Sequence, residues 1–212
     1  QSLKSIFKKE NFWKIETQNN NFTAEKIILA TGSNSKIWEM LQTLGHTIVP
    51  PVPSLFTFNI KDSRIKELPG VSAQVSVKVK DTKLTTTGPL LITHWGMSGP
   101  AILKLSAWGA RILSEKNYQF TIFVNWLNDL DADETEKILK NLKQEHAKKM
   151  VSKKSPFEIT NRLWESLVFA SNIHEETKWA DLSKIQMQNL VNQLTNSSFQ
   201  VNGKSTFKEE FV

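Results

Sequence analysis

Cysteine is absent from this chain of 212 residues, which excludes disulfide bonds and thiolate nucleophiles. The sequence also lacks any run of about 18 consecutive apolar residues, the length that a membrane-spanning helix requires. No segment has the pattern of a signal peptide. We therefore expect a cytoplasmic protein with no membrane partner.

The motifs that hold nucleotide phosphates or metals are missing as well. Neither a Gly-x-Gly-x-x-Gly fingerprint nor a Walker loop occurs, so the chain has no phosphate cradle for a dinucleotide. No Gly-x-Ser-x-Gly elbow presents a serine nucleophile. The histidines are too dispersed to indicate metal ligands, at His46, His94, His146 and His174. We predict no metal site.

The two ends of the sequence lack the character of natural termini. The chain begins at Gln1 rather than at methionine and stops at Val212. We expect it to be an internal fragment of a longer protein.

A net charge of +6 raises the alternative of a non-catalytic basic module that binds nucleic acid or protein. Most lysines are scattered, and the densest cluster is Lys148, Lys149, Lys153 and Lys154. Because this cluster follows a predicted helix, its charges complement a helix C-terminus. No aromatic residues interleave these lysines, as base stacking would require. We favour a solvated helix end and predict no nucleic-acid partner, and the basic module stays as the alternative.

Residues 1–50 have the pattern of two strands and a short helix. Alternation over residues 11–18 predicts a half-buried strand, and the asparagines of residues 19–21 predict a turn. The apolar run within residues 23–31 predicts a strand buried on both faces. Apolar spacing over residues 34–44 predicts a helix.

Prolines at residues 50–53 mark a crossing into a second region. From residue 51 to residue 130 the pattern is mainly short strands, at residues 71–79, 83–93 and 118–126. One helix is expected over residues 100–113, with one apolar side formed by Ile102, Leu105, Trp108 and Ile112. The spacing of the strands predicts a small β-barrel or sandwich-like domain.

Residues 131–197 have helical patterns and predict a helical domain. Capping boxes are expected to begin its helices, at Asp131, Ser155 and Ser183. Residues 198–212 return to the β-rich domain, and Asn202-Gly203 predicts a hairpin there. The fold class expected from these patterns is α+β.

The first candidate site is the turn Ala30-Thr31-Gly32, at the end of the predicted buried strand. Open α/β sheets bind ligands at the carboxyl ends of their strands, and glycine lets the backbone approach a cofactor closely. A strand that simply ends in a glycine turn explains the same residues equally well.

The second candidate site lies in residues 88–101, where a strand delivers Thr93 and His94 into a glycine turn. Ser98 is expected to cap the helix that Gly99 and Pro100 open. Such a turn suits an anion or a polarised carbonyl, and His94 could donate a proton there. The alternative is structural: Ser98 caps, the glycines shape the turn, and His94 makes a structural hydrogen bond.

Taken together, these segments resemble the BaiN/YhiN-like family of NAD(P)/FAD-dependent oxidoreductases, which includes an aminoacetone oxidase. The resemblance extends in order over essentially the whole chain. It rests on residues 28–32, on residues 44–55, and above all on residues 88–101, with the core Thr-His-x-Gly-x-Ser-Gly-Pro-Ala.

Members of that family have a Rossmann-like FAD domain interrupted by a barrel-like domain and a helical domain. The resemblance implies that residues 1–50 are a remnant of the FAD-binding domain, followed by the inserted domains over residues 51–130 and 131–197. Ala30, Thr31 and Gly32 would contact FAD in the whole protein. Ser33 departs from the glycine that is usual after this turn.

The resemblance also implies redox chemistry carried by the flavin, with a small-molecule substrate and NAD(P)H as a candidate partner. Thr93, Gly96 and Ser98 would bind the substrate, and His94 would be the catalytic proton donor. Because the phosphate cradle is missing, we expect this chain alone to bind no FAD and to be inactive.

Overall fold

The computed structural model describes residues 2–205. The chain divides into two compact units, residues 1–51 and residues 52–212, with the boundary among the prolines of residues 50–53. No helix of the described part is both long and apolar enough to cross a membrane.

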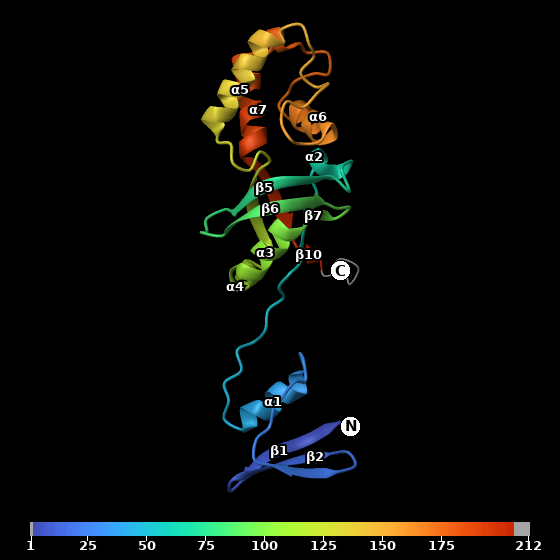
Figure 1. Ribbon diagram of the computed structural model, residues 1–212, viewed down its shortest axis with the longest axis vertical. Helices are drawn as coiled ribbons and strands as arrows, with labels where there is room; N and C mark the ends of the chain where they lie inside the picture. The colour runs from blue at the N-terminus through green and yellow to red at the C-terminus, as the bar shows by residue number, and fades with distance from the viewer. Residues whose placement is uncertain (1, 206–212) are drawn as a thin grey trace. The chain divides into compact units, whose positions relative to one another are not determined.

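The first unit is a three-stranded antiparallel sheet with one helix (Figure 1). Its strands are β1 (Leu3–Lys9), β2 (Phe12–Thr17) and β3 (Asn21–Ala24), with β2 in the middle. The predicted strand over residues 11–18 is confirmed as β2, whereas β1 lies where no strand was predicted. The predicted helix is confirmed as α1 (Ser35–Thr43), and Asn34 caps it by accepting a hydrogen bond from the Lys36 amide at 3.1 Å.

The predicted strand over residues 23–31 is wrong beyond Ala24. Residues 25–34 form no strand, and the side chains of Ile28 and Leu29 are 93% and 39% exposed. A strand buried on both faces needs paired neighbours and a covering layer on each side. Within residues 2–51 every described strand pairing is antiparallel, and none includes residues 27–30. The Rossmann-like identity of this unit therefore stays a prediction.

The second unit is built on a seven-stranded antiparallel sheet with the order β10-β4-β7-β6-β5-β8-β9. Its strands are β4 (Thr57–Asn59), β5 (Ser72–Val79), β6 (Thr85–Ile92), β7 (Gly96–Ser98), β8 (Gln119–Asn125), β9 (Ser197–Asn202) and β10 (Lys204–Ser205). The predicted strands over residues 71–79, 83–93 and 118–126 are confirmed as β5, β6 and β8. Strand β5 alternates as expected, since Val75, Val77 and Val79 are fully buried.

One continuous segment, β9 followed by β10, borders both edges of this sheet. Val201 of β9 pairs with Phe120 of β8, and Lys204 of β10 pairs with Phe58 of β4. The hairpin predicted at Asn202-Gly203 is wrong, because β9 and β10 do not pair with each other. A two-residue hairpin of that type needs positive φ at both residues, and only Gly203 has it, at 148°. The segment instead bends at Gly203 and closes the sheet into the predicted barrel.

The helix predicted over residues 100–113 consists of α3 (Pro100–Trp108) and α4 (Ala110–Glu115), separated at Gly109. Ile102 and Leu105 are fully buried as expected, but Trp108 and Ile112 are 63% and 40% exposed. The backbone at Gly109 leaves helical geometry (φ −90°, ψ 5°), so one helical period does not extend across it. Leu113 is the buried residue of α4.

Two of the three predicted capping boxes are confirmed. Asp131 begins α5 (Ala132–Glu145) and Ser183 begins α7 (Lys184–Thr195), each with the reciprocal side-chain contact. The box at Ser155 is wrong, since α6 (Asn161–Ala170) begins later and is capped by Thr160. Ser155 Oγ instead accepts a hydrogen bond from the Phe157 amide at 3.1 Å, a local turn that competes with helix formation.

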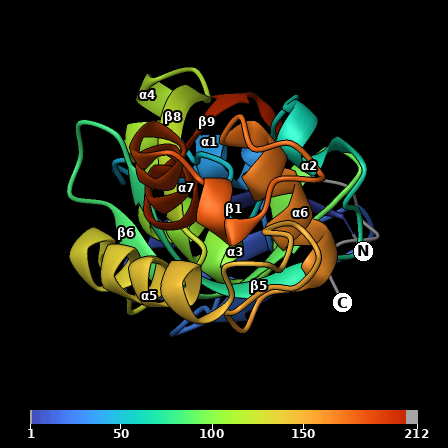
Figure 2. The same cartoon turned by 90° about the horizontal axis from the view of Figure 1, so that it is seen from above.

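Helix α7 packs against α5, α6 and strands β8 and β9, so it joins the helices to the barrel (Figures 1 and 2). The 3-10 turn η1 (Trp179–Asp181) packs on α5, and the short helix α2 (Ser63–Lys66) packs on α6. One hydrophobic core runs through barrel and helices, from Phe56 to Val201. The α+β class is confirmed, and the separation of residues 51–130 from residues 131–197 as two domains stays a prediction.

Candidate functional site

The turn between β6 and β7 is held by hydrogen bonds of its own residues. Thr93 Oγ1 accepts from the Trp95 amide at 3.3 Å and from the Gly96 amide at 3.2 Å. The Thr93 amide donates to the Gly96 carbonyl at 2.9 Å, and the Trp95 carbonyl accepts from the Ile60 amide at 2.9 Å. The turn is therefore fixed to the segment that follows β4.

Gly96 is required by the close approach of β4 to this turn. Its φ is 151°, and a Cβ built on it would lie 2.2 Å from the Phe58 carbonyl oxygen and 2.5 Å from the Ile60 nitrogen. Both neighbours are backbone atoms of β4 or the residue after it, which cannot move aside as a flexible side chain can. Gly96 thus shapes the turn by the absence of a side chain.

Ser98 does not cap helix α3, contrary to the prediction. It is the last residue of β7, pairs with Leu91 of β6 and is only 5% exposed. Its Oγ accepts a hydrogen bond from Thr57 Oγ1 at 3.0 Å. The N-cap position belongs to Gly99, which has no side-chain cap, because pairing in the sheet holds Ser98 one residue earlier.

His94 is exposed and lies at a depression of about 380 Å³ next to the turn. The depression is lined by Thr93 and His94 and by residues of the segment after β4, namely Ile60, Lys61, Asp62, Ser63, Ile65 and Lys66. The Asp62 carboxylate is paired with Arg64, which leaves Lys61 and Lys66 as the cations of the lining. The structure thus brings two of the predicted residues together with two cations that sequence reasoning missed. Such a depression can accept a polar group that carries or develops negative charge.

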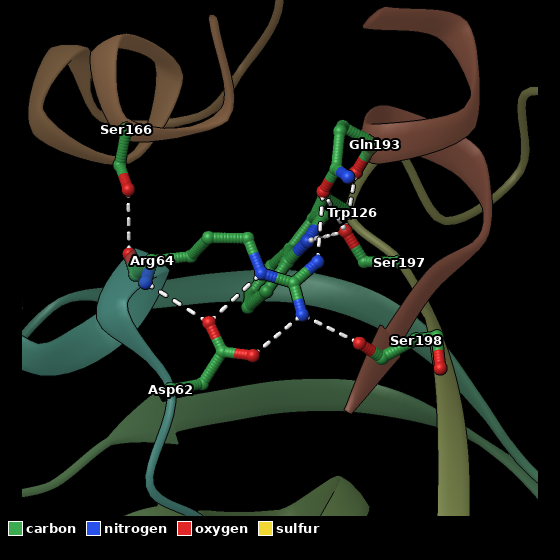
Figure 3. A network of polar contacts seen from close by, with 7 residues as sticks. All are labelled: Asp62, Arg64, Trp126, Ser166, Gln193, Ser197 and Ser198. Atoms are coloured by element: carbon green, nitrogen blue, oxygen red, sulfur yellow. Dashed lines mark hydrogen bonds and ion pairs between the residues drawn. The ribbon is translucent and has the colours of Figure 1, made fainter. Parts of the chain in front are cut away.

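The segment opposite His94 is held by Arg64, whose guanidinium takes part in a network of polar contacts (Figure 3). Asp62 binds it in bidentate fashion, at 2.9 Å to Nε and 2.7 Å to Nη2. Gln193 of α7 accepts from Nη1 at 2.8 Å, and the Ser198 carbonyl accepts from Nη2. The guanidinium carbon lies 4.0 Å from the centroid of the Phe199 ring.

Helix α6 joins this network at the backbone of Arg64, where Ser166 Oγ donates to the Arg64 carbonyl at 2.6 Å. Trp126 Nε1 donates to Ser197 Oγ at 3.1 Å, beside the end of α7 (Figure 3). The network therefore joins α2, α6, α7 and β9, and one of its members, Asp62, also lines the depression. Asp62 as a helix cap could be recognised from local sequence, but Gln193 lies 129 residues from Arg64, and no local pattern reports such a contact.

Burial raises the pKa of the Asp62 carboxyl, but the hydrogen bonds and positive charge of Arg64 outweigh it and leave the pKa below its usual range. Since the unfolded chain binds this proton more readily, the contribution to stability is present above the unfolded pKa of about 4 and is lost as pH falls toward the folded pKa.

We expect the unaltered protein to have a larger free energy of unfolding than the Asp62→Asn variant at pH 7. The difference between the two should shrink as pH falls from about 5 toward 3. Urea denaturation at several pH values measures this. A difference that stays constant over the range would show that the Asp62 charge contributes nothing.

Ala30, Thr31 and Gly32 are exposed residues of the first unit. Gly32 has φ 63°, and a Cβ built on it meets no atom within 4 Å, so its backbone is accessible to a flat ligand. This geometry fits the edge of a flavin, but described residues provide no phosphate cradle beside it. The assignment of these three residues to FAD stays a prediction. Among residues 2–205 no three His, Asp or Glu side chains gather as metal ligands would.

Comparison with known proteins adds two relatives. The ribosomal RNA dihydrouridine synthase of Haemophilus influenzae is 24% identical over 204 residues, which are 92% of this chain and 48% of that protein. The 3-dehydro-bile acid delta(4,6)-reductase of Clostridium scindens is 25% identical over 134 residues, which are 58% of this chain and 32% of that protein. The chain thus spans less than half the length of each of these relatives.

A family model described as "HI0933-like protein barrel and H2TH domain" matches residues 52–212. This range holds the closed sheet, the helices, the Thr93–Ser98 turn and the depression beside it. The resemblance inferred from residues 88–101 is therefore confirmed, and the chain belongs to the HI0933-like, BaiN/YhiN-like family of flavoproteins.

Proposed function

We propose that this chain forms the substrate-side part of a flavin-dependent reductase that saturates a carbon–carbon double bond conjugated to a carbonyl group. The family match and the bile-acid reductase relative indicate flavin-dependent oxidoreductase chemistry at the level of the family. The names of both relatives describe such a saturation, of an unsaturated 3-oxo bile acid and of a uracil ring. The observation that carries the proposal is the depression that places His94 with Lys61 and Lys66.

Saturation adds a hydride to the β-carbon and a proton to the α-carbon, so two electrons enter the substrate. FAD supplies the hydride when it is bound in the whole protein, and NAD(P)H is the candidate source of its electrons. Lys61 and Lys66 stabilise the negative charge that develops on the carbonyl oxygen. His94, exposed at the same depression, delivers the proton.

The remaining turn residues have graded roles in this proposal. Thr93 lines the depression and is placed to contact the substrate. Gly96 and Ser98 are buried and support the turn from behind, Gly96 by its close approach to β4 and Ser98 through Thr57. Ala30, Thr31 and Gly32 would contact the flavin.

A second candidate substrate is a uracil base within ribosomal RNA. It is favoured by the dihydrouridine synthase relative, whose match covers 92% of this chain, and by the net charge of +6. On this reading the reductase and the nucleic-acid binder are one protein rather than competing alternatives. If the substrate is RNA, the prediction of no nucleic-acid partner is wrong. If the substrate is a steroid-like enone, that prediction is unaffected.

The test is reoxidation of the reduced flavin in the whole protein, with a steroid enone and with uridine-containing ribosomal RNA as alternative acceptors. We expect His94→Ala to slow reoxidation about 100-fold, because a positioned general acid contributes on that order. Reduction of the flavin by NAD(P)H should stay unchanged. His174→Ala, an exposed histidine remote in sequence, is the matched control. Equal rates for His94→Ala and the unaltered protein would refute the role of His94, and the acceptor that reacts identifies the substrate class.

A further inference from the structure

A second depression, of about 350 Å³, lies where helix α5 ends. Its apolar side is formed by Leu142, Met150 and Trp179, and its polar side by His146, Lys149 and Lys154. No carboxylate lines it. An apolar surface beside several cations suits a ligand that combines a phosphate with a sugar or base.

The two lysines of this depression are available for a ligand. Among residues 2–205 neither Lys149 nor Lys154 has a carboxylate within ion-pair distance, whereas neighbouring Lys153 Nζ lies 2.7 Å from Glu175. Lys143, in the last turn of α5, donates to the Leu182 carbonyl. The charge of Lys149 and Lys154 is thus left uncompensated, whereas Lys143 and Lys153 are engaged.

The helix C-terminus accounts for only part of this charge. Helix α5 ends at Glu145 with His146 as its cap, and the field of a helix end falls off within its last turn. Lys154 follows the cap by a loop of several residues, so the interpretation as a solvated helix end does not explain its position.

The backbone that carries both lysines is held in place. The Lys149 amide donates to the His146 carbonyl at 2.8 Å, and the Lys149 carbonyl accepts from the Trp179 amide at 3.0 Å. The Ser155 amide, next to Lys154, donates to Asn161 Oδ1 at 3.0 Å. On the protein side, binding therefore mainly orders the two lysine side chains, which limits that part of the entropic cost.

We propose that this depression binds the phosphate backbone of the RNA that carries the substrate base. The proposal rests on the second candidate substrate above, and it assigns to the helical part a role in holding RNA apart from the turn that carries His94. Lys149 and Lys154 contact phosphates, and the apolar side packs against a ribose or base.

The test is binding of a fluorescently labelled, uridine-rich single-stranded RNA to the whole protein over a series of salt concentrations. Loss of two phosphate contacts lowers the slope of log affinity against log salt by about 1.4, which is about 25-fold in affinity at 0.1 M salt. We expect Lys149→Gln with Lys154→Gln to show about this loss. Lys149→Glu with Lys154→Glu should show a larger one, because glutamate also repels phosphate. Lys78→Glu with Lys80→Glu makes the same charge change elsewhere, at two exposed residues on and just after the end of β5.

Equal losses in the two glutamate pairs would mean diffuse attraction and overturn the site. Lysine-dependent binding of uridine monophosphate without binding of RNA would also overturn it, because the ligand would then be a free nucleotide. RNA binding that depends on Lys149 and Lys154, with no reoxidation of the flavin by RNA, would support the site and refute RNA reduction. Reoxidation of the flavin by RNA that is unaffected by the substitutions would support RNA reduction and refute the phosphate-binding site.

Discussion

Replacement of Gly96 by alanine is expected to destabilise the second unit by roughly 3 kcal/mol or more. The added Cβ would lie 2.2 Å from the Phe58 carbonyl oxygen and 2.5 Å from the Ile60 nitrogen, at a φ of 151°. This overlap is relieved only if β7 separates from β4, which also breaks the hydrogen bond from the Ile60 amide to the Trp95 carbonyl. Urea denaturation followed by circular dichroism measures the loss.

Gly70→Ala is the matched control for this substitution. Gly70 also has a positive φ, 87°, but a Cβ there would meet no atom within 4 Å. It therefore reports conformational strain without steric overlap, at about 1 kcal/mol. If Gly96→Ala lost no more stability than Gly70→Ala, the close approach of β4 would not be what requires a glycine in the turn.

Arg64→Met is expected to cost about 3 kcal/mol of unfolding free energy, because it leaves a partly buried carboxylate without its partner. The side chains of Arg64 and Asp62 are only 15% and 23% exposed, so water compensates the loss incompletely. The substitution also removes the hydrogen bonds to Gln193 and Ser198, which join α2 to α7 and β9. The measurement is again urea denaturation at pH 7.

The double variant Asp62→Asn with Arg64→Met separates the unpaired charge from the lost contacts. It should recover part of the stability, because it no longer leaves a partly buried charge without a partner. Lys153→Met, which breaks the exposed pair with Glu175, should change stability little. A loss for Arg64→Met as small as that for Lys153→Met would contradict a structural role for the network.

Elements with a strong local signal were predictable from sequence. Strand β5 follows from strict alternation of valines, and α5 and α7 from capping boxes whose partners are three residues apart. Ser155 has the same local signal, yet its hydroxyl accepts a hydrogen bond from the Phe157 amide, two residues later, instead of capping a helix. Local patterns therefore identify which residues can begin a helix but not which of two short-range bonds forms.

The candidate site was predictable only on one side. The turn residues Thr93, His94 and Gly96 are contiguous, so their glycine pattern and the family resemblance point to them. Lys66 ends the short helix α2 and Lys61 lies just before that helix, both more than 25 residues before His94. Only the pairing of β4 with β7 brings them opposite His94. Ser98 was misplaced because its bond to Thr57 depends on that same pairing.

Taken alone, the sequence established the family through residues 88–101, the α+β class and the position of most helices and strands. These properties depend on residues close together in the chain, whose periodicity and turn chemistry act locally. The closure of the barrel by one bent segment, the Arg64 network and both depressions were decided by the tertiary structure. Each of them joins residues far apart in the chain, and such contacts exist only after the intervening strands and helices have packed.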